Sequence, residues 1–192
     1  MRIEYIILLS YISGSIPFGY LLTKFFLNKD VRKIGSGNIG ATNVLRTGSK
    51  MIGFSTLILD ISKAVIPIIL IKIYFVEYLY ISSLCVFLGH VFPIWLKFKG
   101  GKGVATYVGI LFCINVYLGI SFIIIWALIY FIFKYSSLSS LIGSLSIPII
   151  NFFIFNGEVV FFYIIMFVLI FFTHRENIKR LLNNTESKSK IY

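Results

Sequence analysis

The chain has 192 residues, of which 58% are hydrophobic and only 13% are charged, and its formal net charge is +11. Soluble domains carry about 25% charged residues, so this composition excludes a globular core surrounded by a wetted surface. A basic balance can indicate nucleic acid, anionic lipid or an anionic substrate, but the cytoplasmic loops of membrane proteins are basic in any case. We therefore expect one integral membrane domain over residues 1–192 and no nucleic-acid partner.

Apolar stretches long enough to cross a bilayer follow one another along the chain. A helix needs about 20 apolar residues to cross about 30 Å of hydrocarbon. The uncharged stretch from Gly103 to Phe133 would be roughly 45 Å long as one helix, so we expect it to break near 115–119. The predicted spans are therefore 3–23, 51–71, 78–96, the two halves of 103–133, 138–155 and 159–173. This pattern predicts an all-α, polytopic membrane bundle of seven transmembrane helices.

The basic residues give this bundle an orientation. All but three of the 18 Lys and Arg residues fall in 24–50, 97–102, 134 and 175–190. In a seven-span chain these four stretches lie on the same side, and the positive-inside rule makes that side cytoplasmic. We expect the N-terminus outside and the C-terminus in the cytoplasm.

The first glycine loop, residues 35–46, has the composition of an anion site. Its three glycines let the backbone approach a ligand and present N–H groups to it, and Arg46 can grip a phosphate with two parallel hydrogen bonds. The residues that carry this interpretation are Gly35, Ser36, Gly37, Asn38, Gly40, Thr42, Asn43 and Arg46. The glycine spacing also matches the dinucleotide fingerprint, but the required strand, helix and downstream acid are absent. A lid-like turn without function would use the same small residues.

The second glycine loop, residues 98–106, places Gly100, Gly101 and Gly103 around Lys102 just before an apolar helix. It resembles a phosphate-binding P-loop but lacks the first glycine of that motif. A helix N-terminus beside a lysine still favours an anion. The alternative is a basic turn at the membrane interface. His90 lies near this loop along the chain. It is either part of the site or a histidine packed in the protein interior.

Two further clusters are candidates for substrate contacts. His174 and Asn177 are three residues apart at the start of the polar tail and therefore share a helix face, although a basic helix end at the headgroups would look similar. Ser137 belongs to a run of serines at the entry of the sixth span, where such residues serve as caps or substrate contacts.

Asp60 and Lys63 lie inside the second predicted span and share a helix face. Charges at membrane depth are costly, so they are usually paired or functional. We expect a structural pair that stabilises the bundle near the site, and a proton pathway is the competing interpretation.

Taken together, these clusters resemble the bacterial acyl-phosphate:glycerol-3-phosphate acyltransferases, the PlsY family. The resemblance covers essentially the whole chain, with one departure at Ala64, where glycine is expected. It rests on GSGNIGATNVLR at 35–46, GHVFP at 89–93, FKGGKGVAT at 98–106, SSLSS at 136–140 and HRENIKRLL at 174–182.

The resemblance implies a seven-helix enzyme of the bacterial inner membrane with its active site facing the cytoplasm. The implied reaction moves a fatty acyl group from acyl phosphate to the 1-hydroxyl of sn-glycerol 3-phosphate, giving lysophosphatidic acid and phosphate in the first acylation of phospholipid synthesis. Expected partners are these two substrates, membrane lipid and the enzyme that makes acyl phosphate. The sequence contains no zinc or iron ligand set, so neither a metal nor a cofactor is expected.

The resemblance also implies roles for individual residues. The catalytic residues are expected to be Ser36, Arg46, His90, Lys102 and Asn177. The resemblance makes Asn38, Thr42, Asn43, Ser137 and His174 the expected substrate-binding residues. The composition of the two glycine loops adds Gly37, Gly100, Gly101 and Gly103. The general base is left open among His90, His174 and a substrate phosphate oxygen.

Two alternatives remain at this point. The first is the same acylation with acyl-CoA or acyl carrier protein as donor. The second is a transporter of a phosphorylated metabolite, for which the charges at membrane depth, Asp60 and Lys63, are the best support.

Overall fold

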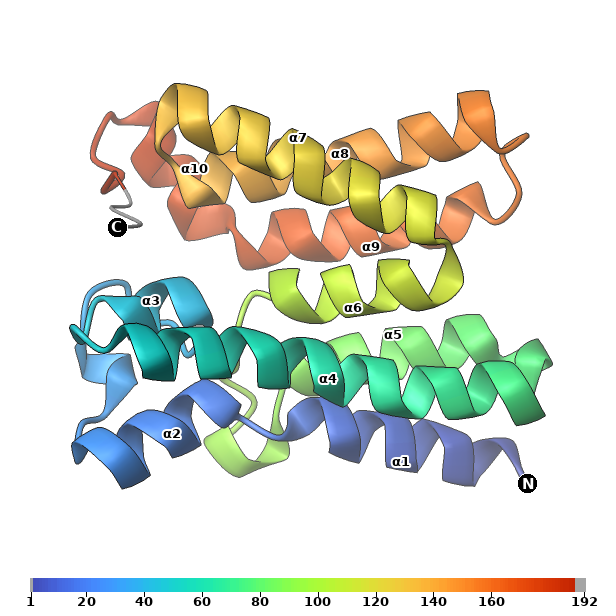
Figure 1. The fold of residues 1–192 in the computed structure, drawn as a ribbon, viewed down its shortest axis with the longest axis horizontal. Helices are drawn as coiled ribbons and strands as arrows, with labels where there is room; N and C mark the ends of the chain where they lie inside the picture. Colours follow the sequence, from blue (N-terminus) through green and yellow to red (C-terminus); the bar gives the residue numbers. More distant parts are fainter. Residues whose placement is uncertain (1, 189–192) are drawn as a thin grey trace. The chain divides into compact units, whose positions relative to one another are not determined.

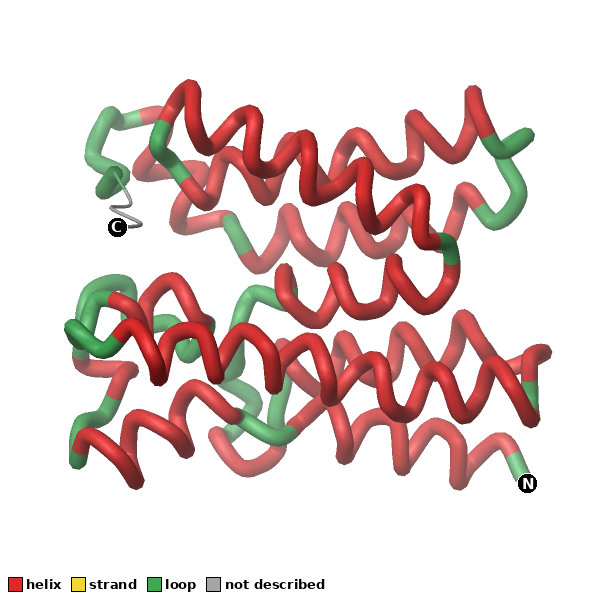
Figure 2. Tube along the Cα trace, in the orientation of Figure 1, coloured by secondary structure: helices red, strands yellow, loops and turns green. Residues whose placement is uncertain are grey.

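The structure, a computed structural model, describes residues 2–188, and all regular secondary structure in that part of the chain is helical (Figure 1, Figure 2). It forms two compact units, unit 1 up to Ile114 and unit 2 from Asn115. The helices described in unit 1 are α1 (Ile3–Ser15), α2 (Phe18–Leu27), α3 (Ala41–Leu45), α4 (Lys50–Tyr74), α5 (Leu79–Val91) and α6 (Val104–Ile114). Those described in unit 2 are α7 (Val116–Phe133), α8 (Ser136–Ile154), α9 (Val160–Thr173) and α10 (Arg175–Leu182).

Several of these helices are long enough to cross a membrane. Within residues 2–188, five helical segments pass this test, and a sixth is counted if α9 and α10, which meet at 63°, form one bent span. The five are 3–27, 50–74, 76–96, 116–133 and 136–154. α6 is apolar but has only 11 residues. The prediction of an all-helical, multi-pass membrane protein is confirmed, whereas the number of crossings stays a prediction.

The predicted break inside 103–133 is present between α6 and α7. Asn115 adopts an extended backbone there, and its side-chain oxygen accepts hydrogen bonds from the backbone N–H groups of Tyr117 and Leu118 at 2.9 and 3.3 Å. An asparagine in this position satisfies N–H groups that have no partner within the helix. The break is therefore an N-cap that starts α7.

The first span is also broken, which the sequence pattern did not indicate. α1 ends at Ser15 and α2 begins at Phe18, because Pro17 has no N–H with which to continue the helical ladder. The carbonyl of Ile16 lies at this break, where it accepts hydrogen bonds from the Phe18 N–H at 3.1 Å and from Lys63 Nζ at 2.7 Å. A charged side chain on α4 thus stabilises the backbone at which α1 gives way to α2.

The predicted pairing of Asp60 with Lys63 is present on α4. Lys63 Nζ lies 2.8 Å from Asp60 Oδ1, and the side chains of Lys63 and Asp60 are only 1% and 3% exposed respectively. Neither charge faces lipid unpaired, which agrees with the cost of isolated charges at membrane depth.

Other helices of unit 1 start or end at the same depth along α4 as this ion pair. We call this depth the Asp60 level. His90, at the end of α5, has its Nδ1 3.7 Å from Asp60 Oδ1, and Thr106, at the start of α6, donates to the Asp60 carbonyl at 3.4 Å. α4 itself continues from the Asp60 level to Lys50, about 15 Å at roughly 1.5 Å per residue. Alongside that half of α4 lie non-helical chain and short helices.

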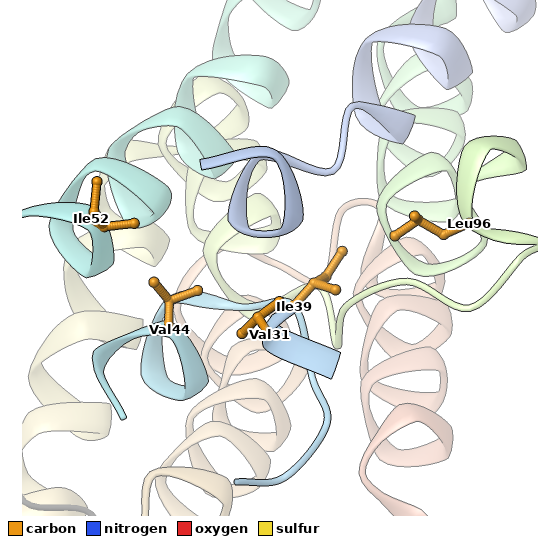
Figure 3. Packing of buried hydrophobic residues seen from close by; sticks show 5 residues of the cluster. All are labelled: Val31, Ile39, Val44, Ile52 and Leu96. Atoms are coloured by element: carbon orange, nitrogen blue, oxygen red, sulfur yellow. The ribbon is translucent and has the colours of Figure 1, made fainter. Parts of the chain in front are cut away.

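A hydrophobic cluster joins these segments to one another. It brings residues of the 28–49 segment together with the start of α4 and with the turn that follows α5, as Figure 3 shows. Its buried members are Val31, Ile39, Val44, Ile52 and Leu96. Fully burying side chains of this size stabilises by about 1.5–3 kcal/mol each. The cluster thus contains Ile39 and Val44 of the first glycine loop, together with Leu96, two residues before the second glycine loop.

Unit 2 is built on a hairpin of α7 and α8. The chain reverses at Lys134, whose φ of 63° is left-handed, and Trp126 Nε1 donates to Ser140 Oγ across the pair at 3.1 Å. Gly143 on α8 allows the ring of Phe122 to pack against its backbone. α9 returns alongside α8, and the chain turns at His174 into α10 (Figure 1).

The ion pair at the Asp60 level provides the first testable prediction. Asp60→Ala leaves the buried Lys63 ammonium without a counter-charge, which costs about 3–5 kcal/mol in comparable buried pairs. We expect a clearly lower melting temperature in detergent. The control Asp30→Ala removes a carboxylate from a surface pair and should change stability by less than about 1 kcal/mol. Replacing both partners, Asp60→Leu with Lys63→Met, should restore most of the loss, and an unaltered melting temperature for Asp60→Ala would show that the pair is not structural.

Candidate functional site

Asn43 holds the first glycine loop in shape. Its side chain is buried, with a residue exposure of 3%. Its Oδ1 accepts from the Ser36 N–H at 2.9 Å, and its Nδ2 donates to the carbonyls of Val31, Ile34 and Asn38 at 3.1, 2.9 and 2.8 Å. The amide is therefore fully used by the loop backbone. Asn43 thus positions the residues around it, and its expected role in substrate binding stays a prediction.

Gly35 permits the close approach that this loop requires. Its φ is 54°, a left-handed value that side chains adopt at a cost. A Cβ added there would lie only 2.7 Å from Arg46 Cδ and 2.5 Å from Asn43 Oδ1. The glycine thus brings the backbone against the Arg46 side chain, which is exposed at the end of α3.

The charge of Arg46 is not neutralised by the loop itself. Asp30 is the sole acid between 24 and 50, and Arg32 pairs with it at 2.7 Å. Hydrogen bonds from the Arg32 side chain lower the pKa of the Asp30 carboxyl to about 2. Within residues 2–188, no carboxylate forms an ion pair with Arg46. Its guanidinium is therefore available for an anion from outside the protein.

The remaining polar residues of the first glycine loop belong to the same segment as Arg46. Asn38 accepts from the Gly40 N–H at 2.7 Å and so stabilises a local turn. Gly37, with a φ of 72°, and Ser36 are exposed, and Thr42 is half-buried on α3. Ser36 and Gly37 therefore present hydroxyl and backbone to solvent next to the turn that Asn43 holds.

The second glycine loop folds back onto the end of α5. Gly100 and Gly101 donate their N–H groups to the carbonyls of Val91 and His90 at 3.0 and 3.1 Å. A Cβ at Gly101 would overlap His90 Nε2, and one at Gly100 would overlap the His90 carbonyl oxygen. Both glycines are therefore required for the loop to lie against α5. His90, which is 3% exposed, supports the loop from below and also faces Asp60.

Lys102 follows directly, at the N-terminus of α6. Lys102 is half-buried, and Gly103 has a φ of 84° with its backbone against the ring of Phe87. α6 thus starts at the Asp60 level with a cation and N–H groups, about 15 Å along α4 from Lys50. Non-helical backbone at membrane depth is tolerated where it is buried in protein or lines a water-filled cavity. This loop combines recessed backbone with positive charge, as an anionic ligand requires.

Unit 2 brings Ser137 and Asn177 onto one carboxylate. Ser137 Oγ and Asn177 Nδ2 donate to Glu186 Oε1 at 2.7 and 2.6 Å, and Arg180 Nε lies 2.6 Å from Oε2. Partial burial would raise the pKa of Glu186, but hydrogen bonds from Arg180, Ser137 and Asn177 outweigh it and hold the pKa below its usual range. Glu186 is thus a carboxylate in a site built for an anion.

The other residues singled out in unit 2 have structural partners. Ser139 and Ser140 donate to the carbonyls of Tyr135 and Ser136 within their own helix. His174 is buried, and its Nδ1 lies 2.8 Å from the Ile170 carbonyl. Because that oxygen only accepts, a neutral His174 carries its proton on Nδ1 and leaves Nε2 as the acceptor.

Two residues of this cluster were missed at the level of the sequence. Arg180 follows Asn177 by three residues and shares its helix face, so the spacing was sufficient to include it. Glu186 had no such signal, because it lies in a polar tail beyond α10 and reaches the cluster through a chain reversal. Only the tertiary structure brings it to Ser137.

Comparison with known proteins gives a consistent answer. A family model described as glycerol-3-phosphate acyltransferase matches residues 5–184. The glycerol-3-phosphate acyltransferase of Pelagibacter ubique (strain HTCC1062) is 64% identical over 191 residues, which is 98% of this chain and 100% of that protein. The enzyme of the same name from Mesorhizobium japonicum is 46% identical over 178 residues, which is 93% of this chain and 91% of that one.

Solved structures agree with the sequence comparison. The crystal structure of PlsY (YgiH), an integral membrane glycerol 3-phosphate acyltransferase, is similar in its glycerol 3-phosphate form with a TM-score of 0.91 and 35% identity, covering 97% of this chain and 95% of that chain. Its lysophosphatidic acid form gives a TM-score of 0.86 and 34% identity, covering 96% and 94%.

The role of Asn43 gives a prediction that does not depend on activity. Asn43→Asp keeps the shape of the side chain but turns a carboxylate oxygen toward three carbonyls, so buried donors are replaced by repulsion. We expect hydrogen exchange of residues 31–46 to accelerate by at least about fivefold, since a lost buried hydrogen bond costs about 1–3 kcal/mol.

The matched control is Asn115→Asp. Asn115 uses only its side-chain oxygen, as an acceptor at the start of α7, and aspartate serves equally well as an N-cap. Exchange in the first turn of α7 should stay within about twofold of the parent. Equal effects of the two substitutions would contradict the assignment of Asn43 as the residue that holds the loop.

Proposed function

The chain belongs to the glycerol-3-phosphate acyltransferase family, and we propose that it transfers a fatty acyl group from acyl phosphate to the 1-hydroxyl of sn-glycerol 3-phosphate. The products are lysophosphatidic acid and inorganic phosphate. Both proposed substrates carry a phosphate, and the acyl chain is apolar, so the reaction suits a membrane protein with cationic glycine loops. PlsY, with which this chain shares its fold, has crystal forms with glycerol 3-phosphate and with lysophosphatidic acid.

The observation that carries the proposal is the pair of glycine loops in unit 1. The first loop shares a hydrophobic cluster with Leu96, two residues before the second loop, and each loop carries a cation, Arg46 or Lys102, beside glycines. Two such loops on one half of a helix bundle provide donors for phosphate oxygens. Acyl phosphate as the donor is supported by this chemistry and by the resemblance of the loops.

The mechanism follows from the activation of the donor. Acyl phosphate has a good leaving group, so the glycerol 3-phosphate hydroxyl attacks the acyl carbonyl directly, the C–O bond to phosphate breaks, and phosphate leaves. No enzyme nucleophile is needed, and Cys85 and Cys113 are both buried in apolar surroundings. Arg46 and Lys102 hold phosphate and stabilise the negative charge that develops during transfer. Ser36 and Asn177 orient the substrates.

The burial of His90 bears on the choice of general base. Its ring lies under Gly101 and beside Asp60, so we assign it the role of positioning the second glycine loop. His174 is the other histidine, and its Nδ1 lies 2.8 Å from the Ile170 carbonyl. A proton from the attacking hydroxyl is therefore accepted by His174 or by a substrate phosphate oxygen.

The proposed setting is the bacterial inner membrane, with seven crossings, the N-terminus outside and the C-terminus in the cytoplasm. The short α6 is compatible with a crossing, because it extends from the Asp60 level to Cys113, whose carbonyl accepts from Lys72 near the far end of α4. The 92–103 segment covers the remaining depth. The basic stretches then lie on the cytoplasmic side, where the enzyme that makes acyl phosphate is the expected partner.

A transporter of a phosphorylated metabolite is the less favoured alternative. Its best support was the presence of Asp60 and Lys63 inside a span. In unit 1 these residues pair with each other, and Lys63 also binds the Ile16 carbonyl. Charges used in this way are explained by the architecture and need no transport role.

The donor is tested with the purified protein. Acyl phosphate and glycerol 3-phosphate together should give lysophosphatidic acid and an equal amount of phosphate. Acyl-CoA or acyl carrier protein in place of acyl phosphate should give none, because the proposed phosphate site binds the leaving group of the donor. Turnover with acyl-CoA at a comparable rate would overturn the donor assignment. Counterflow in liposomes without product would instead support the transporter.

The geometry of Arg46 is tested by Arg46→Lys, which keeps the positive charge but removes the two-pronged contact with phosphate. Loss of one hydrogen bond to a charged group corresponds to at least about a tenfold lower kcat/KM. Arg32→Lys is the matched control, because Arg32 lies in the same segment but pairs with Asp30 at the surface. Activity should be retained in that control, and near-normal activity of Arg46→Lys would rule out the bidentate role.

A further inference from the structure

Three donors in unit 2 converge on a single carboxylate that belongs to the same chain. Ser137 comes from the start of α8, Asn177 and Arg180 come from α10, and the acceptor, Glu186, follows α10. Ser137 and Asn177 are only 5% and 4% exposed. A hydroxyl, an amide and a guanidinium that all point at one acceptor-only group constitute the donor set of an anion site.

We infer that Ser137, Asn177 and Arg180 form one anion-binding site, and that the Glu186 carboxylate fills this site until a phosphate group of a substrate replaces it. Arg180 is the cation of the site and becomes a substrate-binding residue in addition to those assigned above. The inference rests on the proposed function for the identity of that phosphate. The site itself stands on the contacts of Glu186.

The tail that carries Glu186 is weakly attached to the rest of unit 2. Beyond Glu186 itself, it is held by backbone N–H groups that donate to the carbonyls of Lys179, Arg180 and Leu181, and by the Thr185 hydroxyl, which donates to the Arg180 carbonyl at 3.4 Å. The neighbours of Glu186 in the tail are all exposed: Asn183, Asn184, Thr185, Ser187 and Lys188. Segments with so few buried contacts open at low free-energy cost. Glu186 can therefore leave while α8, α9 and α10 stay folded.

A substrate phosphate is able to compete with this tethered carboxylate. A group on a short flexible tether acts at an effective concentration on the order of millimolar. Enzyme KM values run from about 1 μM to 1 mM, so a substrate in its usual range can displace the tether. A phosphate also carries more charge than a carboxylate and offers three strong acceptor oxygens. The exchange replaces one negative group by another, so Arg180 is never left without a counter-charge.

Two of the three donors are positions at which the family resemblance expects substrate contacts, namely Ser137 and Asn177. A tail that served only to reinforce the fold would have no reason to use these side chains. Glu186 therefore restricts access to donors that the reaction uses, and the apparent affinity for the displaced substrate is reduced by the fraction of time that the tail is bound.

The first experiment measures KM for glycerol 3-phosphate and for acyl phosphate separately, in the full-length enzyme and in Glu186→Gln. The glutamine keeps the size of the side chain but removes the charge that attracts Arg180. If the tail fills the site about nine-tenths of the time, KM for the substrate that uses the site should fall by about tenfold, with kcat unchanged. The affected substrate identifies the source of the phosphate. Glu158→Gln, an exposed acid in the connection between α8 and α9, is the matched control and should change neither KM.

The second experiment does not depend on turnover. Backbone hydrogen exchange of residues 183–188 is followed with inorganic phosphate and with chloride at equal ionic strength. Phosphate should accelerate exchange of the tail in the parent protein, and exchange in Glu186→Gln should be fast without phosphate. In Arg180→Gln, phosphate should have little further effect on exchange.

The outcomes separate this inference from the proposed function. A lower kcat with unchanged KM in Glu186→Gln, or tail exchange that does not respond to phosphate, would overturn the inference and make Glu186 a structural clamp. A protein that transfers no acyl group but releases its tail on binding phosphate would overturn the proposed function and leave the anion site standing.

Discussion

The arrangement of unit 1 depends on one buried ion pair, between Asp60 and Lys63. Lys63 also binds the carbonyl left at the break between α1 and α2, while Asp60 faces His90 at the end of α5 and accepts from Thr106 at the start of α6. Four helices thus begin, end or break at one level inside an apolar bundle. Exposed helix ends are not tolerated in lipid, so these ends must be satisfied by protein or by water in a cavity.

The glycine loops follow from this arrangement. Because α5 ends and α6 begins at the Asp60 level, the second glycine loop is recessed, and its glycines allow it to lie directly on His90. The first glycine loop is held by the side chain of Asn43 and shares a hydrophobic cluster with the turn after α5. Each loop presents one cation, Arg46 or Lys102, from backbone that packing keeps in place. Such preorganised charge is the main means by which proteins stabilise developing negative charge.

Unit 2 also gathers hydrogen-bond donors for an anion, but they are side chains on helices and not part of a glycine loop. Its donors are side chains of α8 and α10, and all of them contact the carboxylate of Glu186 in the tail. An internal carboxylate keeps buried donors satisfied in the absence of a ligand, which avoids the cost of leaving them without acceptors. The Glu186 contact therefore has two consequences. It satisfies the donors when no ligand is bound, and it restricts access to them.

The sequence by itself determined the class of protein, the positions of most apolar helices, the break at Asn115 and the family, because hydropathy, charge and long motifs are local properties of the chain. It also indicated the pairing of Asp60 with Lys63, since residues three apart share a helix face. Only the tertiary structure decided that Asn43 holds its loop, that His90 lies under Gly101, and that Glu186 reaches Ser137. These contacts join residues through chain reversals and helix packing, and no local spacing encodes which distant group will occupy a donor. The use of each polar side chain was therefore settled by three-dimensional proximity, whereas its chemical capability was already evident from the residue type.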